Sequence, residues 1–211
     1  MNFKRIAVGG SAADPPHLGH LALIKTLINC QLFDAVIWIP SGKRPDKKIS
    51  IEADHRVAMT ELTFPTALRI RPSTTLIIKY NDIYQSNTPT IEWLEQLQAQ
   101  FPMAPITWYT GSDSVRPQKK YAGRCAIEAA WNRGAELIAK WNFLIMPRRG
   151  YTLPPSLPAN FQVLNIGGGL PNISSSKIRN LIQAKKPFEH LVTAEVAEYI
   201  KRFGLYQGEK R

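Results

Sequence analysis

The chain has 211 residues, and 44% of them are hydrophobic, which is enough apolar surface for the core of one ordinary domain. Lysine and arginine outnumber aspartate and glutamate by 27 to 16, so the formal net charge is +11 and polyanionic ligands or nucleic acid are the first partners to consider. No window approaches the roughly 20 apolar residues of a membrane span, and residues 1–10 lack the apolar core of a secretory signal, so we expect a cytoplasmic protein.

Short β-type runs alternate with helical patterns along the chain. The expected strands are Arg5–Val8, Ala35–Ile39, Leu68–Arg71, Ile106–Thr110, Phe143–Met146 and Gln162–Ile166. The expected helices are Leu18–Gln31, Asp54–Thr63, Thr90–Gln100, Ala126–Lys140, Ser175–Ala184 and Ala194–Phe203. This alternation predicts an α/β fold in one domain, residues 1–211, with a Rossmann-like, doubly wound, mostly parallel sheet and helices on both faces. Ligands of such a fold bind at the carboxyl ends of the strands.

A glycine-rich loop joins the first expected strand to the first expected helix. It contains Gly9, Gly10 and Ser11, and it ends in His17 and His20. The glycines permit close approach of the backbone, while the helix start presents N–H groups and a positive dipole end. The segment therefore predicts a phosphate site.

His17 and His20 are spaced so that both share one face if they lie in the first helical turn, where they can converge on one ligand. A metal site is an alternative, but zinc needs three or four protein ligands and the His-Glu-x-x-His context is absent. A pair of helix-capping or surface histidines is the other alternative.

A second polar cluster opens a helix far downstream. Three hydroxyls, Ser174–Ser176, follow the flexible Gly167–Gly169 and precede Lys177 and Arg179 at helical spacing. A serine cap followed by a solvated basic face is the ordinary interpretation. The combination of three hydroxyls with two cations favours a second polyphosphate site instead.

These motifs resemble the His-x-Gly-His and Ile-Ser-Ser-x-x-Ile-Arg signatures of a nucleotidyltransferase superfamily. From about Arg5 to Tyr206 the chain resembles the bacterial nicotinate-nucleotide adenylyltransferases, which make deamido-NAD and pyrophosphate from ATP and nicotinate mononucleotide. Further matches in the same order are residues 40–47, Asp54, Arg56, Met59, residues 110–114 and residues 148–151.

The resemblance implies three groups of site residues. The catalytic group is His17, His20 and Arg179. The ATP-binding group is Gly9, Gly10, Ser11, Lys47, Gly111, Asp113, Ser175 and Ser176. The acceptor-binding group is Asn87, Thr88, Trp131 and Arg148. The implied cofactor is Mg²⁺, held by the substrate phosphates without ligands from protein side chains.

Two of these residues have ordinary structural alternatives. Asp113 could be the N-cap of a helix. Trp131 lies near Ile127 and Leu137 in one helical stripe, so core packing is the alternative to stacking on a pyridine ring.

A polyanionic substrate pair explains the basic residues, so we expect neither a nucleic-acid nor a membrane partner, and self-association stays open. Cys30 and Cys125 fit neither a disulfide framework nor a metal spacing, so we expect free thiols. Three other functions stay open: a nicotinamide mononucleotide adenylyltransferase, a more distant nucleotidyltransferase of the same superfamily, and a nucleotide-sensing module without turnover.

Overall fold

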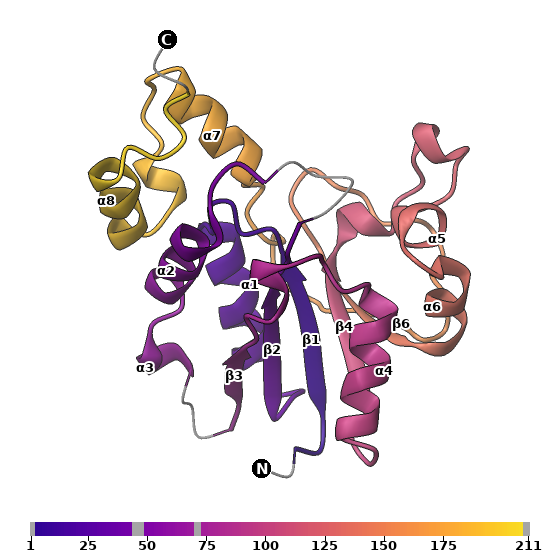
Figure 1. Ribbon diagram of the computed structural model, residues 1–211. Coiled ribbons are helices and arrows are strands. Elements are labelled where there is room, and N and C mark those ends of the chain that lie inside the picture. Colours follow the sequence, from indigo (N-terminus) through magenta and orange to yellow (C-terminus); the bar gives the residue numbers. More distant parts are fainter. Residues whose placement is uncertain (1–2, 44–48, 70–72, 209–211) are drawn as a thin grey trace.

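The computed structural model describes residues 3–43, 49–69 and 73–208, and a six-stranded sheet forms its centre (Figure 1). The strands are β1 (Ile6–Ser11), β2 (Ala35–Pro40), β3 (Thr75–Ile78), β4 (Ile106–Gly111), β5 (Asn142–Met146) and β6 (Phe161–Val163). Their order is β3-β2-β1-β4-β5-β6, and every neighbouring pair is parallel. The predicted doubly wound parallel sheet is confirmed.

Helices connect the strands and cover the sheet. The α-helices are α1 (Leu18–Asn29), α2 (Ala53–Thr63), α3 (Thr66–Arg69), α4 (Thr90–Gln100), α5 (Ala126–Ala130), α6 (Gly134–Lys140), α7 (Ser175–Gln183) and α8 (Ala194–Arg202). Short 3₁₀ turns are η1 (Asp82–Tyr84), η2 (Ser112–Ser114), η3 (Lys119–Tyr121) and η4 (Glu189–Leu191). Among the residues that the structure describes, no helix is long and apolar enough to cross a bilayer.

Both faces of the sheet are buried. Along β1, Ile6 and Val8 belong to the core that α4 covers, whereas Ala7 belongs to the core that α1 covers. The inner strand β2 accordingly reads as an unbroken apolar run that is buried along its whole length, as is usual for parallel strands with helices on both sides. The α1 side chains Ile24 and Leu27 are fully buried, and each such burial stabilises the fold by roughly 1.5–3 kcal/mol.

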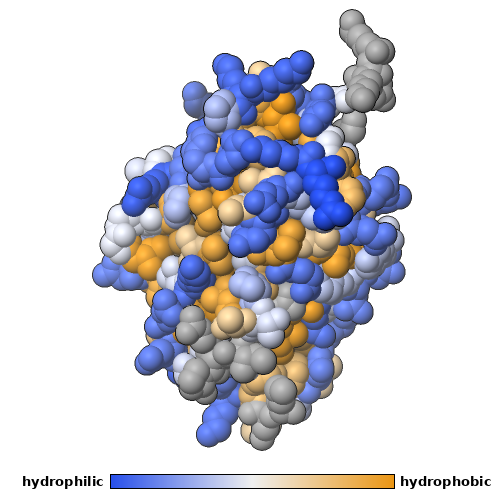
Figure 2. Space-filling view, turned by 90° about the vertical axis from the view of Figure 1, so that its left-hand side faces the viewer, coloured by the Kyte–Doolittle hydropathy of each residue, from blue (hydrophilic) through white to orange (hydrophobic). Residues whose placement is uncertain are grey.

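A third apolar cluster lies at one end of the sheet, where α2, α7 and α8 pack together. Its members include Met59, Ile178 and Val196, all fully buried. Figure 1 places α7 and α8 beside α2, beyond the sheet, and Figure 2 shows apolar patches among hydrophilic side chains on this side of the molecule. The cluster fixes the chain's last helices against the segment that follows β2.

Two expected elements differ in the structure. The predicted strand Leu68–Arg71 is wrong, because Thr66–Arg69 forms α3 and the strand beside β2 is Thr75–Ile78; residues 70–72 lie outside the described part. The backbone N–H of Leu68 donates to the Pro65 carbonyl at 2.8 Å, so a helical turn starts at this proline. An alternating run of two apolar residues was too short to distinguish strand from helix.

The predicted helix Ala126–Lys140 is two helices, α5 and α6. Arg133 has a left-handed backbone with φ of 51°, which interrupts the helical path. A Cβ at Gly134 would lie 2.1 Å from the carbonyl oxygen of Ile127, so glycine permits the two helices to approach closely.

The strand order reverses between β1 and β4, the two central strands. From β1 the sheet extends towards one edge through β2 and β3. From β4 it extends towards the opposite edge through β5 and β6. Such a switch point opens a crevice outside the carboxyl ends of the strands. The loops after Ser11 and Gly111 lie at this position.

Candidate active site

The loop after β1 ends in a histidine pair that belongs to the start of α1. His17 is the N-cap, and its Nδ1 accepts the N–H of Gly19 at 3.1 Å. The N–H of His17 donates to Nδ1 of His20 at 3.2 Å, and the two rings stack with centroids 3.7 Å apart. The prediction that these side chains share a face is confirmed, and capping is part of the same arrangement.

The capping contacts set the proton positions of both rings. Because each Nδ1 accepts a backbone N–H, each neutral ring carries its proton on Nε2. Nε2 of His20 lies 3.1 Å from Oγ of Ser11, at the end of β1. The pair can thus donate hydrogen bonds to an anion above the loop.

Gly9 and Gly10 are part of β1 rather than of the loop. Gly9 is buried and Gly10 is exposed at the end of the strand. A Cβ at Gly10 would lie 1.9 Å from the carbonyl oxygen of Ile39, so the second glycine is needed for the approach of β1 to β2. The close approach inferred from the sequence therefore includes contacts inside the sheet.

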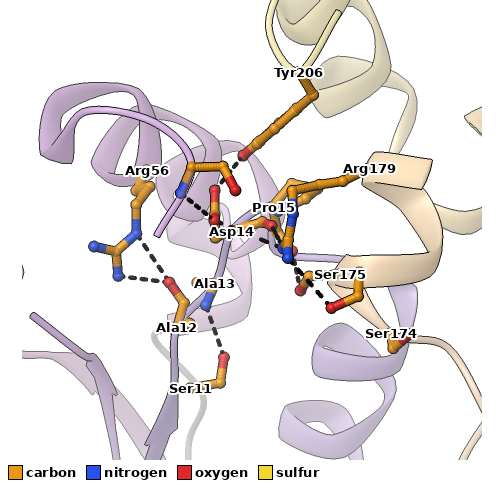
Figure 3. Close-up of polar contacts among 12 residues, drawn as sticks. Ser11, Ala12, Ala13, Asp14, Pro15, Arg56, Ser174, Ser175, Arg179 and Tyr206 are labelled. Carbon is orange, nitrogen blue, oxygen red and sulfur yellow. Dashed lines mark hydrogen bonds and ion pairs between the residues drawn. The ribbon is translucent and has the colours of Figure 1, made fainter. Parts of the chain in front are cut away.

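The start of α7 lies against the same loop, as Figure 3 shows. Oγ of Ser175 donates to the carbonyl oxygen of Pro15 at 2.9 Å, and Nη1 of Arg179 donates to that of Asp14 at 2.7 Å. Nη2 of Arg179 contacts Oγ of Ser176 at 3.3 Å, and Ser174 caps the helix. The structure thus brings together two segments that are 160 residues or more apart in the chain.

Arg56 connects the loop after β1 with the loop after β2. The residue is 2% exposed, and its guanidinium donates to the carbonyl oxygen of Ala12 from Nε at 2.9 Å and to that of Ser41 from Nη2. Burial lowers the pKa of this guanidinium from its ordinary value, although the nearby Asp14 opposes the shift. In the sequence Arg56 is only one member of a motif, whereas in the structure its N–H groups hold two loops of the candidate site together.

The loop after β4 carries Asp113 within η2. Gly111 is the N-cap there and Asp113 makes no capping contact, so the N-cap alternative is wrong. The carboxylate is 43% exposed, and its Oδ1 lies 3.8 Å from Nη1 of Arg148, at the end of β5. Arg148 also donates from its backbone to Oγ of Ser112 at 3.1 Å and from its guanidinium to the carbonyl oxygen of Ile173. Arg148 therefore connects the β4 and β5 loops with the segment before α7.

The sequence analysis missed Arg116, which lies on this side of the site. The guanidinium carbons of Arg116 and Arg148 lie 4.9 Å and 5.5 Å from the ring centroid of Tyr151. Both distances permit cation–π attraction. The signal available in the sequence was the basic run 116–124, which contains no acidic residue.

The predicted acceptor residues lie in two places. Asn87 lies beside the loop after β2, because its N–H donates to the carbonyl oxygen of Lys43 at 3.1 Å. The hydroxyl of Thr88 donates to Asp82 at 2.7 Å, so its proton already has an acceptor within the protein.

Trp131 ends α5 and packs against Trp108 and Phe143, with ring centroids 6.2 Å and 6.5 Å away. These contacts agree with the core-packing alternative for Trp131.

Lys47 lies outside the described residues. Cys30 and Cys125 are both free thiols, as predicted.

Comparisons with known proteins agree with this geometry. A family model described as cytidylyltransferase-like matches residues 8–181. A probable nicotinate-nucleotide adenylyltransferase of Oceanobacillus iheyensis is 27% identical over 210 residues, 97% of each chain. One of Halalkalibacterium halodurans is 29% identical over 207 residues, 97% of this chain and 92% of the relative.

Among solved structures, the Plasmodium falciparum nicotinic acid mononucleotide adenylyltransferase complexed with NaAD matches with a TM-score of 0.78. The alignment covers 99% of this chain and 100% of that one at 18% identity. At this identity the likeness concerns the fold, and it extends over the whole chain.

Proposed function

This chain belongs to the cytidylyltransferase-like family, and we propose that within it the protein is a nicotinate-nucleotide adenylyltransferase. The enzyme joins ATP and nicotinate mononucleotide to give deamido-NAD and pyrophosphate, a step of NAD biosynthesis. The two curated relatives carry this activity in their names, and the solved structure of the same fold is a complex with NaAD. The observation that carries the proposal is the contact of α7 with the histidine loop, which brings together the two distant motifs that were predicted to bind phosphate.

The chemistry needs positioning more than a reactive protein group. A phosphate oxygen of the mononucleotide attacks the α-phosphorus of ATP, a new P–O bond forms, and the bond to the bridging oxygen breaks as pyrophosphate leaves. The attacking phosphate is already anionic near neutral pH, so no protein nucleophile or strong base is required. The protein must align two polyanions and stabilise the charge that develops on the leaving group.

The histidines and α7 suit this task. Nε2–H of His20 is the proposed donor to the bridging oxygen, where negative charge grows in the transition state, and His17 contacts the same triphosphate. Arg179 and Ser176 would bind the β- and γ-phosphates through charge-assisted hydrogen bonds. The hydrogen bonds of Ser175 and Arg179 to the loop support this assignment, because they hold the start of α7 beside the histidine loop.

Mg²⁺ fits the site as a companion of the substrate. Asp14 accepts hydrogen bonds from Ser50 and Tyr206, and Asp113 faces Arg148. Both carboxylates thus have partners within the protein, and neither is positioned as a ligand for the metal ion. We expect the ion to be held by phosphate oxygens and water, as is common for Mg²⁺. When bound, it would reduce the repulsion between the two polyanions.

The remaining assignments follow the same geometry. Gly111 and Asp113 are proposed for the adenosine part of ATP, and Arg148 and Asn87 for the acceptor. Roles for Lys47, Thr88 and Trp131 stay predictions, as do the cytoplasmic location, the single domain and any self-association.

Release of pyrophosphate with a panel of mononucleotide acceptors tests the proposal. We expect ATP- and Mg²⁺-dependent turnover with nicotinate mononucleotide, at a higher kcat/KM than with the nicotinamide form. Equal or inverted preference would move the assignment to the nicotinamide enzyme. No turnover with any acceptor, together with intact ATP binding, would favour the nucleotide-sensing module.

A further inference from the structure

Asp14 lies where three distant parts of the chain meet, as Figure 3 shows. The residue is 1% exposed and sits in the loop after β1. The N–H of Ser50 donates to Oδ2 at 2.8 Å, and the hydroxyl of Tyr206 donates to Oδ1 at 2.9 Å. Oδ2 also lies 3.7 Å from Nη1 of Arg179. A buried carboxylate with these partners is fixed in position and in rotamer.

Arg179 takes its orientation from the same residue. Nη1 donates to the backbone oxygen of Asp14 and faces the Asp14 carboxylate, so one edge of the guanidinium is anchored on the loop. A guanidinium carries five N–H donors, which is more than these contacts use. The side chain is 19% exposed. Arg179 can therefore bind a phosphate while Asp14 sets its direction.

Tyr206 connects this arrangement to the last turn of the described chain. Its ring is part of the apolar cluster of α2, α7 and α8, and the residue is 8% exposed. Burial, together with the negative charge of Asp14, raises the pKa of the phenol far above its ordinary value. The hydroxyl thus keeps its proton at neutral pH and remains a donor to Asp14.

Backbone strain marks both ends of this connection. Ala13, next to Asp14, has φ of 48°, and Tyr206 has φ of 64°. Residues with a Cβ rarely adopt this left-handed conformation, and they keep it only where the surroundings determine it strongly. Such strain gathers where a precise geometry is required.

We infer that Tyr206 and Asp14 are positioning residues of the phosphate site, in which the Tyr206 hydroxyl holds Asp14 so that Arg179 is aimed at the phosphates of ATP. The inference rests on the proposed function. Neither side chain touches the reacting atoms, and Tyr206 acts across 192 positions of sequence. The C-terminal turn is thereby part of the nucleotide site.

The test compares Tyr206→Phe with Tyr199→Phe by direct titration of ATP with Mg²⁺ and no acceptor. Both variants lose one hydroxyl near α8, but the Tyr199 hydroxyl contacts Nδ1 of His55 at 3.0 Å and not Asp14. We expect Tyr206→Phe to raise the Kd for ATP about 10-fold, or about 1.4 kcal/mol. Tyr199→Phe should change it by less than about 2-fold. Equal Kd values for the two variants would overturn the inference.

A double-mutant cycle with Arg179→Ala separates positioning from general stability. If Tyr206 acts through Arg179, Tyr206→Phe should leave the Kd of the Arg179→Ala protein nearly unchanged while still lowering its Tm. The same loss of affinity with and without Arg179 would show a merely structural role.

Asp14→Asn provides the test if Tyr206→Phe does not fold. It keeps the size of the side chain and an acceptor for Tyr206, but it removes the charge that faces Arg179. An unchanged Kd would contradict the inference. Failure of the proposed function is read separately, from the products of the unmodified enzyme with nicotinate mononucleotide.

Discussion

The imidazole rings of His17 and His20 lie stacked, with their centroids 3.7 Å apart and their planes 16° from parallel. The backbone N–H groups of Gly19 and His17 hold the two Nδ1 atoms. Each ring is thus fixed in place and in tautomer by the backbone. This fixed position is the physical reason to expect a catalytic contribution from His20, since its Nε2–H, which lies 3.1 Å from Oγ of Ser11, has only to exchange that partner for the leaving oxygen.

His20→Ala should lower kcat by roughly 100-fold or more while the Kd for ATP changes far less, because a contact to the leaving oxygen acts mainly in the transition state. Steady-state kinetics and a separate ATP titration measure the two effects. His190→Ala, at an exposed position in η4, is the matched control and should retain wild-type kcat. If His20→Ala is folded and stays within a few-fold of wild type, the histidine pair is structural.

Arg179→Ala should raise the KM for ATP or reduce turnover, because a guanidinium facing a triphosphate contributes charge-assisted hydrogen bonds of about 1.5–3 kcal/mol. Arg179→Lys should recover only part of this, since lysine keeps the charge but cannot contact the Asp14 carbonyl and a phosphate with one planar group. Initial rates at varied ATP distinguish the variants. Full recovery by lysine would show that charge alone matters at this position.

The sequence predicted the two helix starts that meet at the histidine loop because their signals are local. A histidine N-cap, a serine N-cap and apolar helical spacing each occupy a few adjacent residues, and the structure has them at His17, Ser174 and in α1 and α7. Parallel strands then bring their carboxyl ends to one edge, so local motifs assemble without further information.

The contacts that join distant segments could not be predicted in this way. Arg56 is buried because carbonyl oxygens of two loops accept its N–H groups, and nothing near Arg56 in the sequence marks those loops as partners. The hydroxyl of Tyr206 meets Asp14 through tertiary packing, in which α8 lies against α2. The strand predicted over Leu68–Arg71 fails for the opposite reason. Its pattern is local, but it is too short to distinguish a strand from a helix.

Arg56→Met should lower the free energy of unfolding by roughly 2–5 kcal/mol, because the buried carbonyl oxygens of Ala12 and Ser41 lose their donors. Urea denaturation of both proteins measures the difference. Arg202→Met, at an exposed position in α8, should change the free energy by less than about 0.5 kcal/mol. Equal midpoints for the two variants would mean that water replaces the guanidinium at no cost.

The ion pair between Arg133 and Glu136, at the contact of α4 with α6, should make the stability of the fold depend on pH. Arg133 contacts Glu136 at 2.7 Å and Glu95 at 2.9 Å, and the hydrogen bond with Arg133 lowers the pKa of Glu136 from 4.5 to about 2. A lowered acid pKa adds stability above the unfolded value, and this is lost as the pH falls towards 2. The Tm difference between wild type and Glu136→Gln should therefore be small, constant above about pH 5, and absent near pH 2. Glu195→Gln, at an exposed position in α8, is the control, and a difference that grows on acidification would contradict the expectation.

The net charge of +11 should not translate into stable nucleic-acid binding. Several cations are matched locally by carboxylates: Arg5 with Asp34, Arg133 with Glu95 and Glu136, Lys140 with Glu136, and Lys201 with Glu189. Figure 2 shows hydrophilic side chains interspersed with apolar ones on the face of the molecule that carries α2 and α8.

Binding of duplex DNA and single-stranded RNA should accordingly be weak and should disappear near physiological ionic strength, because scattered cations release few counterions together. A salt-titrated binding assay measures this. Addition of ATP with Mg²⁺ should compete with any residual binding that uses Arg148 or Arg179, since these two cations belong to the proposed acceptor and phosphate loops. Submicromolar binding that persists at physiological salt and resists ATP would show a basic surface separate from the nucleotide site, and it would favour a binding module over the enzyme.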